Sequence, residues 1–225
     1  MNIIALIPAR GGSKGIPKKN IKLFNGEPLV NHSIKYAKNC NLIDKIYVST
    51  DDEEISLISS KAGASVIKRP INISGDNATT ESAIKHTLKS LSKKPDIIVL
   101  LQPTSPYRPK GSLQEALDKF IDNDYDSLLS ISPTHRFIWS IDKKNNLKAS
   151  YDFLKRPRRQ DLKTSEINFI ENGSLYIFKY ESFLLSENRL GGKIGYVEFD
   201  EEFSHEIDTY YDFKFLEGLV KNEKN

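Results

Sequence analysis

The chain has 225 residues, of which 38% are hydrophobic and 28% are charged, so it can bury a substantial core and is neither disordered nor fibrous. Its length fits a single α/β domain over residues 1–225. The formal net charge of +3 is too small to predict binding to nucleic acid or to an acidic membrane surface. The one cysteine, Cys40, excludes an internal disulfide and fits a reducing, cytoplasmic location.

Short apolar runs alternate with amphipathic segments along most of the chain. The apolar runs predict strands at residues 2–8, 44–50, 65–68, 96–102, 126–132 and 173–179. Apolar residues at helical spacing predict helices at residues 28–39, 52–62, 80–91, 112–121 and 209–220. This order predicts a doubly wound, mostly parallel sheet whose ligands bind beyond the carboxyl ends of the strands. The first apolar run is too short to span a membrane, and no basic residues precede it as in a signal peptide.

Residues 133–172 interrupt this alternation, because they are polar and follow neither period. The segment is too long for a simple connection. Its apolar side chains are Phe137, Ile138, Trp139, Ile141, Tyr151, Phe153 and Leu154. A monomer would have to expose them, and exposed apolar surface usually marks an interface. We therefore expect an excursion from the sheet that serves ligand binding and pairs two chains as a homodimer.

The loop after the first predicted strand is strongly basic. Its cations are Arg10, Lys14, Lys18, Lys19 and Lys22, and residues 1–26 contain no acid. Glycines in the same loop let the backbone approach a ligand, so amide groups and lysines could together hold phosphate oxygens. The loop matches neither the P-loop pattern nor the dinucleotide-binding pattern. By itself, the segment fits a surface loop with solvated lysines equally well.

A second basic run, KRPRRQD, occupies residues 155–161. Arginine side chains suit carboxylates and phosphates, because the planar guanidinium group donates two parallel hydrogen bonds. A run of this kind is nevertheless more often an exposed loop. The run alone therefore does not establish a binding site.

Residues 198–213 have the opposite charge, with seven acids and no lysine or arginine. On an extended segment Glu206 and Asp208 point to one side, as oxygen ligands of Mg²⁺ would. Asp208 with Thr209 could instead cap the last helix, and the pattern by itself favours this cap. The acidic run at residues 49–54 is interpreted as a helix start capped by Thr50 or Asp51.

Taken together, these segments resemble the acylneuraminate cytidylyltransferase family, the CMP–sialic acid synthetases. The matching motifs are PARGGSKGIPKKN at 8–20, STDDEEI at 49–55, RP at 69–70, LLQPTSPYR at 100–108, RPRRQD at 156–161, ENGSLYIF at 171–178 and EIDTYYD at 206–212. The resemblance implies a Rossmann-like fold of the nucleotide-diphospho-sugar transferase type. It also implies condensation of CTP with a sialic-type 2-keto acid sugar, N-acetylneuraminate or a close analogue, to give a CMP-sugar and pyrophosphate.

The resemblance further implies roles for individual residues. Arg158, Lys14 and Asp208 would be catalytic, with Arg158 nearest the reacting centre. The substrate-binding residues would be Arg10, Lys19, Asn20, Arg69, Ala78, Thr80, Gln102, Arg156, Arg159, Gln160 and Asn172. Mg²⁺ or Mn²⁺ would bind Asp208 and Glu206, although many relatives carry an aspartate where this chain has Glu206. The partners would be CTP, a nonulosonic acid sugar and a second copy of the chain.

Several alternatives remain open at this level. Legionaminic, pseudaminic or octulosonic acid would suit the same motifs, because these sugars share the groups that the motifs bind. A glycosyltransferase of similar architecture could use Asp51 and Glu53 as metal ligands, and would not need RPRRQD. A non-catalytic homologue could bind cytidine nucleotides, although the intact Arg10, Arg158 and Asp208 argue against it.

Overall fold

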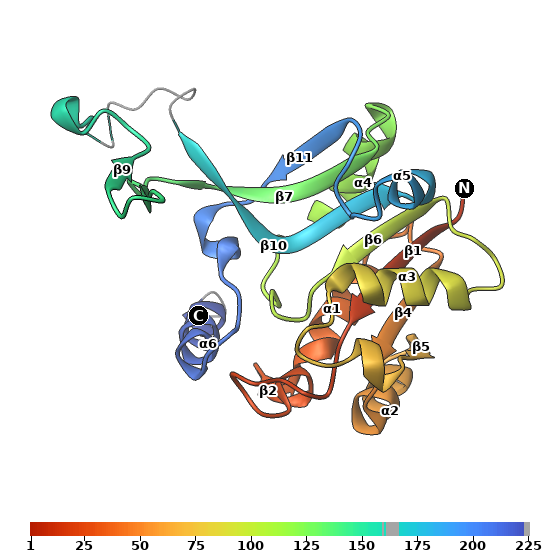
Figure 1. Cartoon of the computed structure of the whole chain (residues 1–225). Helices are drawn as coiled ribbons and strands as arrows, with labels where there is room; N and C mark the ends of the chain where they lie inside the picture. The colour runs from red at the N-terminus through yellow and green to blue at the C-terminus, as the bar shows by residue number, and fades with distance from the viewer. Residues whose placement is uncertain (159, 161–166, 223–225) are drawn as a thin grey trace.

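The structure is a computed structural model that describes residues 1–158, 160 and 167–222. Its centre is a seven-stranded sheet in the order β11-β7-β10-β6-β1-β4-β5 (Figure 1). The strands are β1 (Ile3–Pro8), β4 (Lys45–Thr50), β5 (Ser65–Lys68), β6 (Ile97–Leu101), β7 (Ser127–Thr134), β10 (Asn168–Lys179) and β11 (Ile194–Glu198). β10 runs antiparallel to both of its neighbours, and the other pairs are parallel. The predicted mostly parallel sheet is confirmed.

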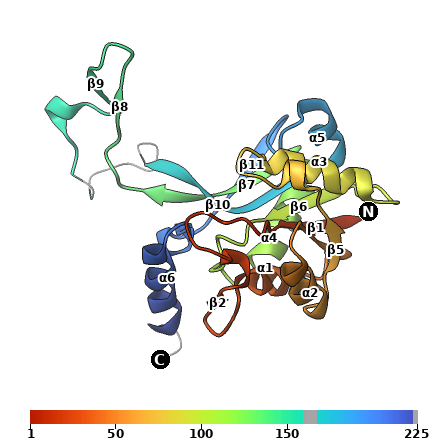
Figure 2. The same cartoon turned by 60° about the horizontal axis from the view of Figure 1, so that its bottom comes forward.

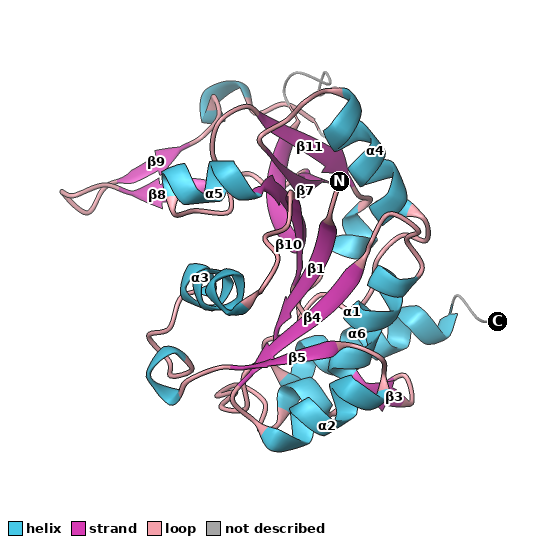
Figure 3. Ribbon diagram, turned by 90° about the vertical axis from the view of Figure 1, so that its right-hand side faces the viewer, coloured by secondary structure: helices cyan, strands magenta, loops and turns pink. Residues whose placement is uncertain are grey.

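Helices cover both faces of this sheet (Figure 3). They are α1 (Leu29–Lys38), α2 (Glu53–Lys61), α3 (Thr80–Ser90), α4 (Ser112–Asp122) and α5 (Tyr180–Ser186). The last helix, α6 (Tyr210–Asn222), lies away from the sheet. Side chains of β1 alternate between the faces, with Ala5 toward α1, α2 and α4 and Leu6 toward α3 and α5. Since both faces are covered, β1 is apolar throughout, as its sequence indicated. No helix in the described part of the chain is long and apolar enough to cross a membrane.

The strand β11 and the helix α5 were not predicted. β11 is an edge strand with Ile194 and Tyr196 largely exposed, so it has no apolar run that marks it as a strand. α5 has only seven residues, too few for a clear helical period. A short hairpin of β2 (Leu23–Phe24) and β3 (Glu27–Pro28) was also missed.

The predicted excursion is an arm that stands away from the sheet (Figures 1 and 2). We call residues 135–158 the arm; it contains the hairpin of β8 (Trp139–Ile141) and β9 (Leu147–Ala149) and a 3-10 helix, η3 (Phe153–Lys155). The predicted limits of 133 and 172 were too wide, because Thr134 and Asn168 still pair across β7 and β10. Whether residues 1–225 form one domain stays a prediction.

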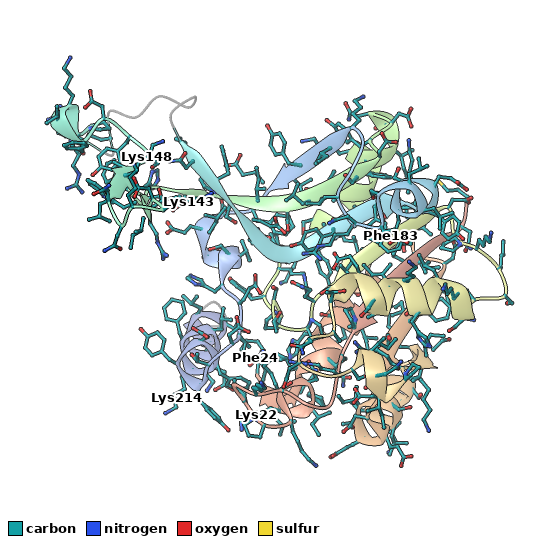
Figure 4. The ribbon with its side chains drawn as sticks, in the orientation of Figure 1. Lys22, Phe24, Lys143, Lys148, Phe183 and Lys214 are labelled. Carbon is teal, nitrogen blue, oxygen red and sulfur yellow. The ribbon has the colours of Figure 1, made fainter. Side chains whose placement is uncertain are left out.

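The last helix, α6, packs against the start of the chain and not against the sheet. Phe213 and Leu216 join Ile16, Phe24 and Leu29 in a small apolar cluster. Figure 4 shows Phe24 and Lys22 beside α6, far from Lys143 and Lys148 on the arm. This packing places the acidic segment before α6 against the basic loop after β1.

Candidate active site

A cavity of about 460 Å³ lies where β1, β5 and β6 end. This is the edge at which open parallel sheets bind ligands. The cavity is lined by nine of the residues predicted from the sequence, namely Arg10, Lys14, Lys19, Asn20, Arg69, Ala78, Thr80, Gln102 and Asp208. The structure thus brings together side chains from both ends of the chain, and we call this cavity the pocket.

Hydrogen bonds fix the shape of the basic loop. The buried Asn20 side chain donates to the carbonyl oxygen of Arg10 at 2.8 Å. The backbone amide of Gly11 donates to the Asp51 carboxylate at 3.1 Å. Lys19 donates through Nζ to the Ile207 carbonyl at 2.8 Å and to Asp208 at 3.1 Å. The basic loop is therefore a preformed surface for a ligand. Lys19 connects this loop to the segment before α6.

Gly15 lies where the two ends of the chain touch. A Cβ atom at this position would lie less than 3.0 Å from the carbonyl oxygen of Asp208. Only glycine lets the backbones come this close. Gly15 thus allows close contact between two segments of the chain. The sequence alone could not reveal this contact.

Arg69 also lines the pocket. Its guanidinium group is buried and donates to the carbonyl oxygen of Ser49 at 2.9 Å. Burial lowers the pKa of Arg69, because the charged form loses hydration. The hydrogen bond to Ser49 fixes the position of the Arg69 guanidinium group in the pocket.

The pocket also contains an acid that sequence reasoning missed, Asp76. Its carboxylate pairs with Lys14 Nζ at 2.8 Å and with Arg10 at 3.3 Å. Hydrogen bonding to Lys14 and the charges of both cations lower the pKa of Asp76. Asp76 follows the short 3-10 helix η2 (Ile71–Ile73) and belongs to no charged run, so no sequence pattern singled it out.

The start of α6 shows which residue caps the helix. Thr209 Oγ1 accepts from the Asp212 amide at 3.3 Å, and the Asp212 carboxylate accepts from the Thr209 amide at 2.7 Å. This reciprocal pair is a capping box. The carboxylate of Asp208 takes no part in it, is 73% exposed and pairs with Lys19. The helix is therefore capped by Thr209 and not by the Asp208 carboxylate, which lines the pocket.

Glu206 lies behind the pocket and does not line it. Its carboxylate lies against Gly173, where a Cβ would come within 3.0 Å of Glu206, and the backbone φ of +65° also favours glycine. Burial raises the pKa of Glu206 to about 7, and the nearby charge of Asp208 adds to the effect. Two carboxylates thus lie close together, that of Glu206 partly buried and that of Asp208 exposed.

The raised pKa of Glu206 predicts a pH dependence of stability. Since its pKa is about 7 in the folded protein and 4.5 ordinarily, the folded state binds the proton more tightly between these values. The resulting stabilisation is complete below pH 4.5 and is lost as the pH rises to about 7. In EDTA, we expect the urea midpoint of the wild-type protein to fall more steeply over this interval than that of Glu206→Gln.

A matched control is Glu187→Gln, because the exposed Glu187 pairs with Lys85 and its pKa is lowered. A lowered pKa gives the opposite sign, since that stabilisation is lost as the pH falls. If the urea midpoints of Glu206→Gln and of the wild-type protein change equally with pH, the pKa of Glu206 is not raised in the folded protein.

Comparison with known proteins identifies the family. The Cytidylyltransferase family model matches residues 4–222. The chain belongs to the cytidylyltransferase family. It is 38% identical to N-acylneuraminate cytidylyltransferase A of Danio rerio, over 97% of this chain and 51% of that protein. It is 32% identical to post-translational flagellin modification protein B of Campylobacter coli, over 99% of this chain and 96% of that protein.

Solved structures show the same fold at low identity. The structure of CMP:2-keto-3-deoxy-manno-octonic acid synthetase complexed with CTP has a TM-score of 0.73 at 15% identity, covering 99% of this chain and all of that one. A 4-diphosphocytidyl-2C-methyl-D-erythritol synthase from Anaerococcus prevotii has a TM-score of 0.68 at 16% identity, covering 98% of each chain. The chain spans about half the length of the first curated relatives that it matches.

Several predicted site residues of this family member lie outside the pocket. The guanidinium group of Arg156 stacks 4.5 Å from the centroid of the Phe137 ring in the arm. Arg158 is also in the arm, and Gln160 is exposed just beyond it. Arg159 lies outside the described residues. Within one chain, the structure does not bring Arg156 or Arg158 to the pocket.

Asn172 is placed differently from its predicted role. Its side chain is 1% exposed and forms hydrogen bonds with Ser130 and Ser132 of β7. It also accepts from the backbone amide of Ser174 at 3.2 Å. Asn172 therefore stabilises the irregular stretch of β10 that carries Gly173, and it does not line the pocket.

Arg108 is a supporting residue that sequence reasoning did not select. It is 7% exposed and donates to the carbonyl oxygens of Gln102 at 2.7 Å and Ser174 at 3.2 Å. Burial lowers its pKa to about 10, and the nearby Tyr36 and Glu206 oppose this shift. Arg108 thus joins the residue after β6 to the middle of β10.

The acids after β4 have structural roles. Asp52, and not Thr50 or Asp51 as predicted, caps α2 by accepting from the Ile55 amide at 2.9 Å. Asp51 accepts from the basic loop. Since Asp51 already has this partner, the acidic run lends little support to the glycosyltransferase alternative.

Proposed function

We propose that the chain joins CTP to the anomeric hydroxyl of a sialic-type 2-keto acid sugar and releases pyrophosphate and a CMP-sugar. The observation that carries this proposal is the basic pocket with the Asp208 carboxylate at its edge. The names of relatives such as the Danio rerio and Streptococcus agalactiae N-acylneuraminate cytidylyltransferases support it. Legionaminate, pseudaminate and octulosonate stay as alternative sugars for the same reaction.

In this proposal, the cations of the pocket hold the triphosphate. Arg10 and Lys14 bind phosphate oxygens, because charge-assisted hydrogen bonds to phosphate are the strong ones. Lys19 supports them and fixes Asp208. The other lining residues frame the cytidine and the sugar hydroxyls; they are Asn20, Arg69, Ala78, Thr80 and Gln102.

We also propose that Mg²⁺ or Mn²⁺ binds Asp208 with Glu206. The fit rests on the chemistry of these two carboxylates, whose mutual repulsion helps to raise the pKa of Glu206. Carboxylate oxygens are the ligands that these cations prefer. Among the described residues, no group of three or more His, Cys, Asp or Glu could hold a metal. When bound, the cation would acidify the attacking hydroxyl and neutralise charge on the phosphates.

A substrate panel tests the proposed function. CTP or UTP is incubated with Mg²⁺ and N-acetylneuraminate, legionaminate, pseudaminate or octulosonate, and pyrophosphate and CMP-sugar are measured. We expect both products with CTP and one of these acids. Release of CMP from a preformed CMP-sugar, with no pyrophosphate from CTP, would support the glycosyltransferase. Binding of CTP without turnover of any acid would support the non-catalytic homologue.

We infer that two chains pair through the arm. Ile141 and Leu154 of the arm are 67% and 83% exposed, so the arm presents apolar surface to water. The arm also carries Arg156 and Arg158, which its own pocket lacks. A twofold-related partner could therefore supply these arginines to the pocket and complete the sugar-binding side.

Trp139→Glu tests the arm. The Trp139 ring packs against Tyr151 and Phe153, with centroids 6.0 and 5.7 Å away. A buried charge at an interface is costly, so we expect a monomer in sedimentation, with weakened sugar binding and nearly unchanged CTP binding. Ile141→Glu should act in the same way with less effect on the arm itself. Lys143→Glu, on the same hairpin, is the control.

The result for the wild-type protein decides this proposal. A wild-type chain that sediments as a monomer at micromolar concentration with full activity would contradict it.

A cytoplasmic location also belongs to the proposal. Its support is Cys40, a buried free thiol of the kind that a reducing compartment maintains.

A further inference from the structure

Asp76 is an acid in a pocket whose proposed ligand is a polyanion. Its two oxygens occupy the cations that would hold the phosphates, Lys14 at 2.8 Å and Arg10 at 3.3 Å. The side chain is 46% exposed and lines the pocket. Arg10 also donates to the backbone carbonyl of Gly75 at 2.7 Å, so the loop contact does not depend on the carboxylate. The carboxylate needs a further explanation.

The charges that line the pocket suggest one. The cations are Arg10, Lys14, Lys19 and Arg69, and the acids are Asp76 and Asp208, which gives 4 − 2 = +2. A free nucleoside triphosphate carries about four negative charges, and its complex with a divalent cation about two. The pocket therefore matches the charge of the metal complex. Without Asp76 the sum would be 4 − 1 = +3, closer to the free triphosphate.

We propose that Asp76 is a specificity-determining residue that favours the metal-complexed triphosphate over free polyphosphates. It cancels one charge of the Arg10 and Lys14 pair and gives way to the phosphates when they bind. The inference rests on the proposed use of CTP. The cations alone would bind the most negative ligand most strongly, and so would favour free polyphosphates. Asp76 reduces this preference.

The proposal predicts a dependence on ligand charge. The Coulomb repulsion between Asp76 and a ligand is proportional to the ligand charge. Removal of the Asp76 carboxylate should therefore increase the binding free energy of free CTP about twice as much as that of Mg·CTP. Because Asp76 is half exposed, salt should screen the effect. A carboxylate that only supported the loop would change both affinities alike.

Equilibrium titration of Asp76→Asn tests this prediction. CTP is titrated once in EDTA and once with saturating Mg²⁺, with UTP as a base-specificity control. We expect about tenfold tighter binding of free CTP and about threefold tighter binding of Mg·CTP, with both gains smaller at high salt. The matched control is Glu54→Gln. It breaks the 2.7 Å ion pair between Glu54 and Lys18 of the same basic loop, and neither of these residues lines the pocket.

Two further variants keep the test decisive. Asp76→Ser replaces Asp76→Asn if the latter fails to fold by circular dichroism. In a Lys14→Ala background, the gain from Asp76→Asn should shrink, because one of its two partners is gone. Weaker binding, or equal gains for the two forms of CTP, would overturn the inference. A wild-type protein that binds neither form would instead overturn the proposed function itself.

Discussion

Replacing Asp208 by Asn is expected to lower kcat/KM by about two orders of magnitude or more and to leave the thermal midpoint close to the wild-type value. The carboxylate is exposed at the edge of the pocket, so its loss removes little packing. It takes no part in the capping box, which Thr209 and Asp212 form. The proposed cation would lose its exposed ligand, so the variant should also need more Mg²⁺ for its residual activity.

The control for this variant is the neighbouring Thr209→Ala. It removes the side-chain cap, which should cost about 0.5 to 2 kcal/mol of stability while activity at low temperature is kept. Initial rates and thermal unfolding of both variants give the comparison. If Asp208→Asn stays active and Glu206→Gln does not, the principal metal ligand is Glu206. If Asp208→Asn unfolds, the ion pair between Asp208 and Lys19 is needed to hold the fold together.

Gly15→Ala is expected to reduce activity by about two orders of magnitude, because the methyl group would push the basic loop away from Asp208. A Cβ at Gly15 would lie less than 3.0 Å from the Asp208 carbonyl oxygen, and backbone cannot yield as a side chain would. The shift would separate Lys19 from its acceptors, Ile207 and Asp208. CTP binding and catalysis should therefore fail together.

Gly12→Ala is the matched control within the same loop. A Cβ at Gly12 would meet no atom within 4 Å, and this residue does not line the pocket. We expect kcat/KM for CTP within about threefold of the wild-type value. Equal losses in the two variants would mean that the loop needs flexibility at both glycines, and that contact with Asp208 is not the reason.

The sheet could be predicted where burial is complete. β1 and β6 are covered on both faces, so nearly every residue is apolar and the pattern is plain. β11 could not be predicted in this way, because one of its faces and one of its edges meet water. The arm was recognised only as an interruption, since its strands pair with each other and have no core beneath them.

The site could be predicted in part. Arg10, Lys14 and Asp208 belong to charged segments and to family motifs, so both kinds of reasoning selected them. Asp76 could not be found, because its importance arises from ion pairs across 62 and 66 residues that only the folded loops create. Motif matching selected Asn172 for the pocket, but its buried amide is used by two serines of β7.

The junction of the chain ends also has a consequence for the order of folding. Lys19 and the carbonyl of Ile207 are 188 residues apart in sequence, and α6 holds them together through Phe213 and Leu216. The strands β1, β4, β5 and β6 all lie in the first half of the chain and can pair before the rest has left the ribosome. A nascent chain at that stage has four of the seven strands and every lining residue of the pocket except Asp208. Because closure over so long a loop comes late, Lys19 gains its two acceptors, and the pocket gains Asp208, at the end of folding. The activity proposed above should therefore be absent from incomplete chains, even where their basic loop is already formed.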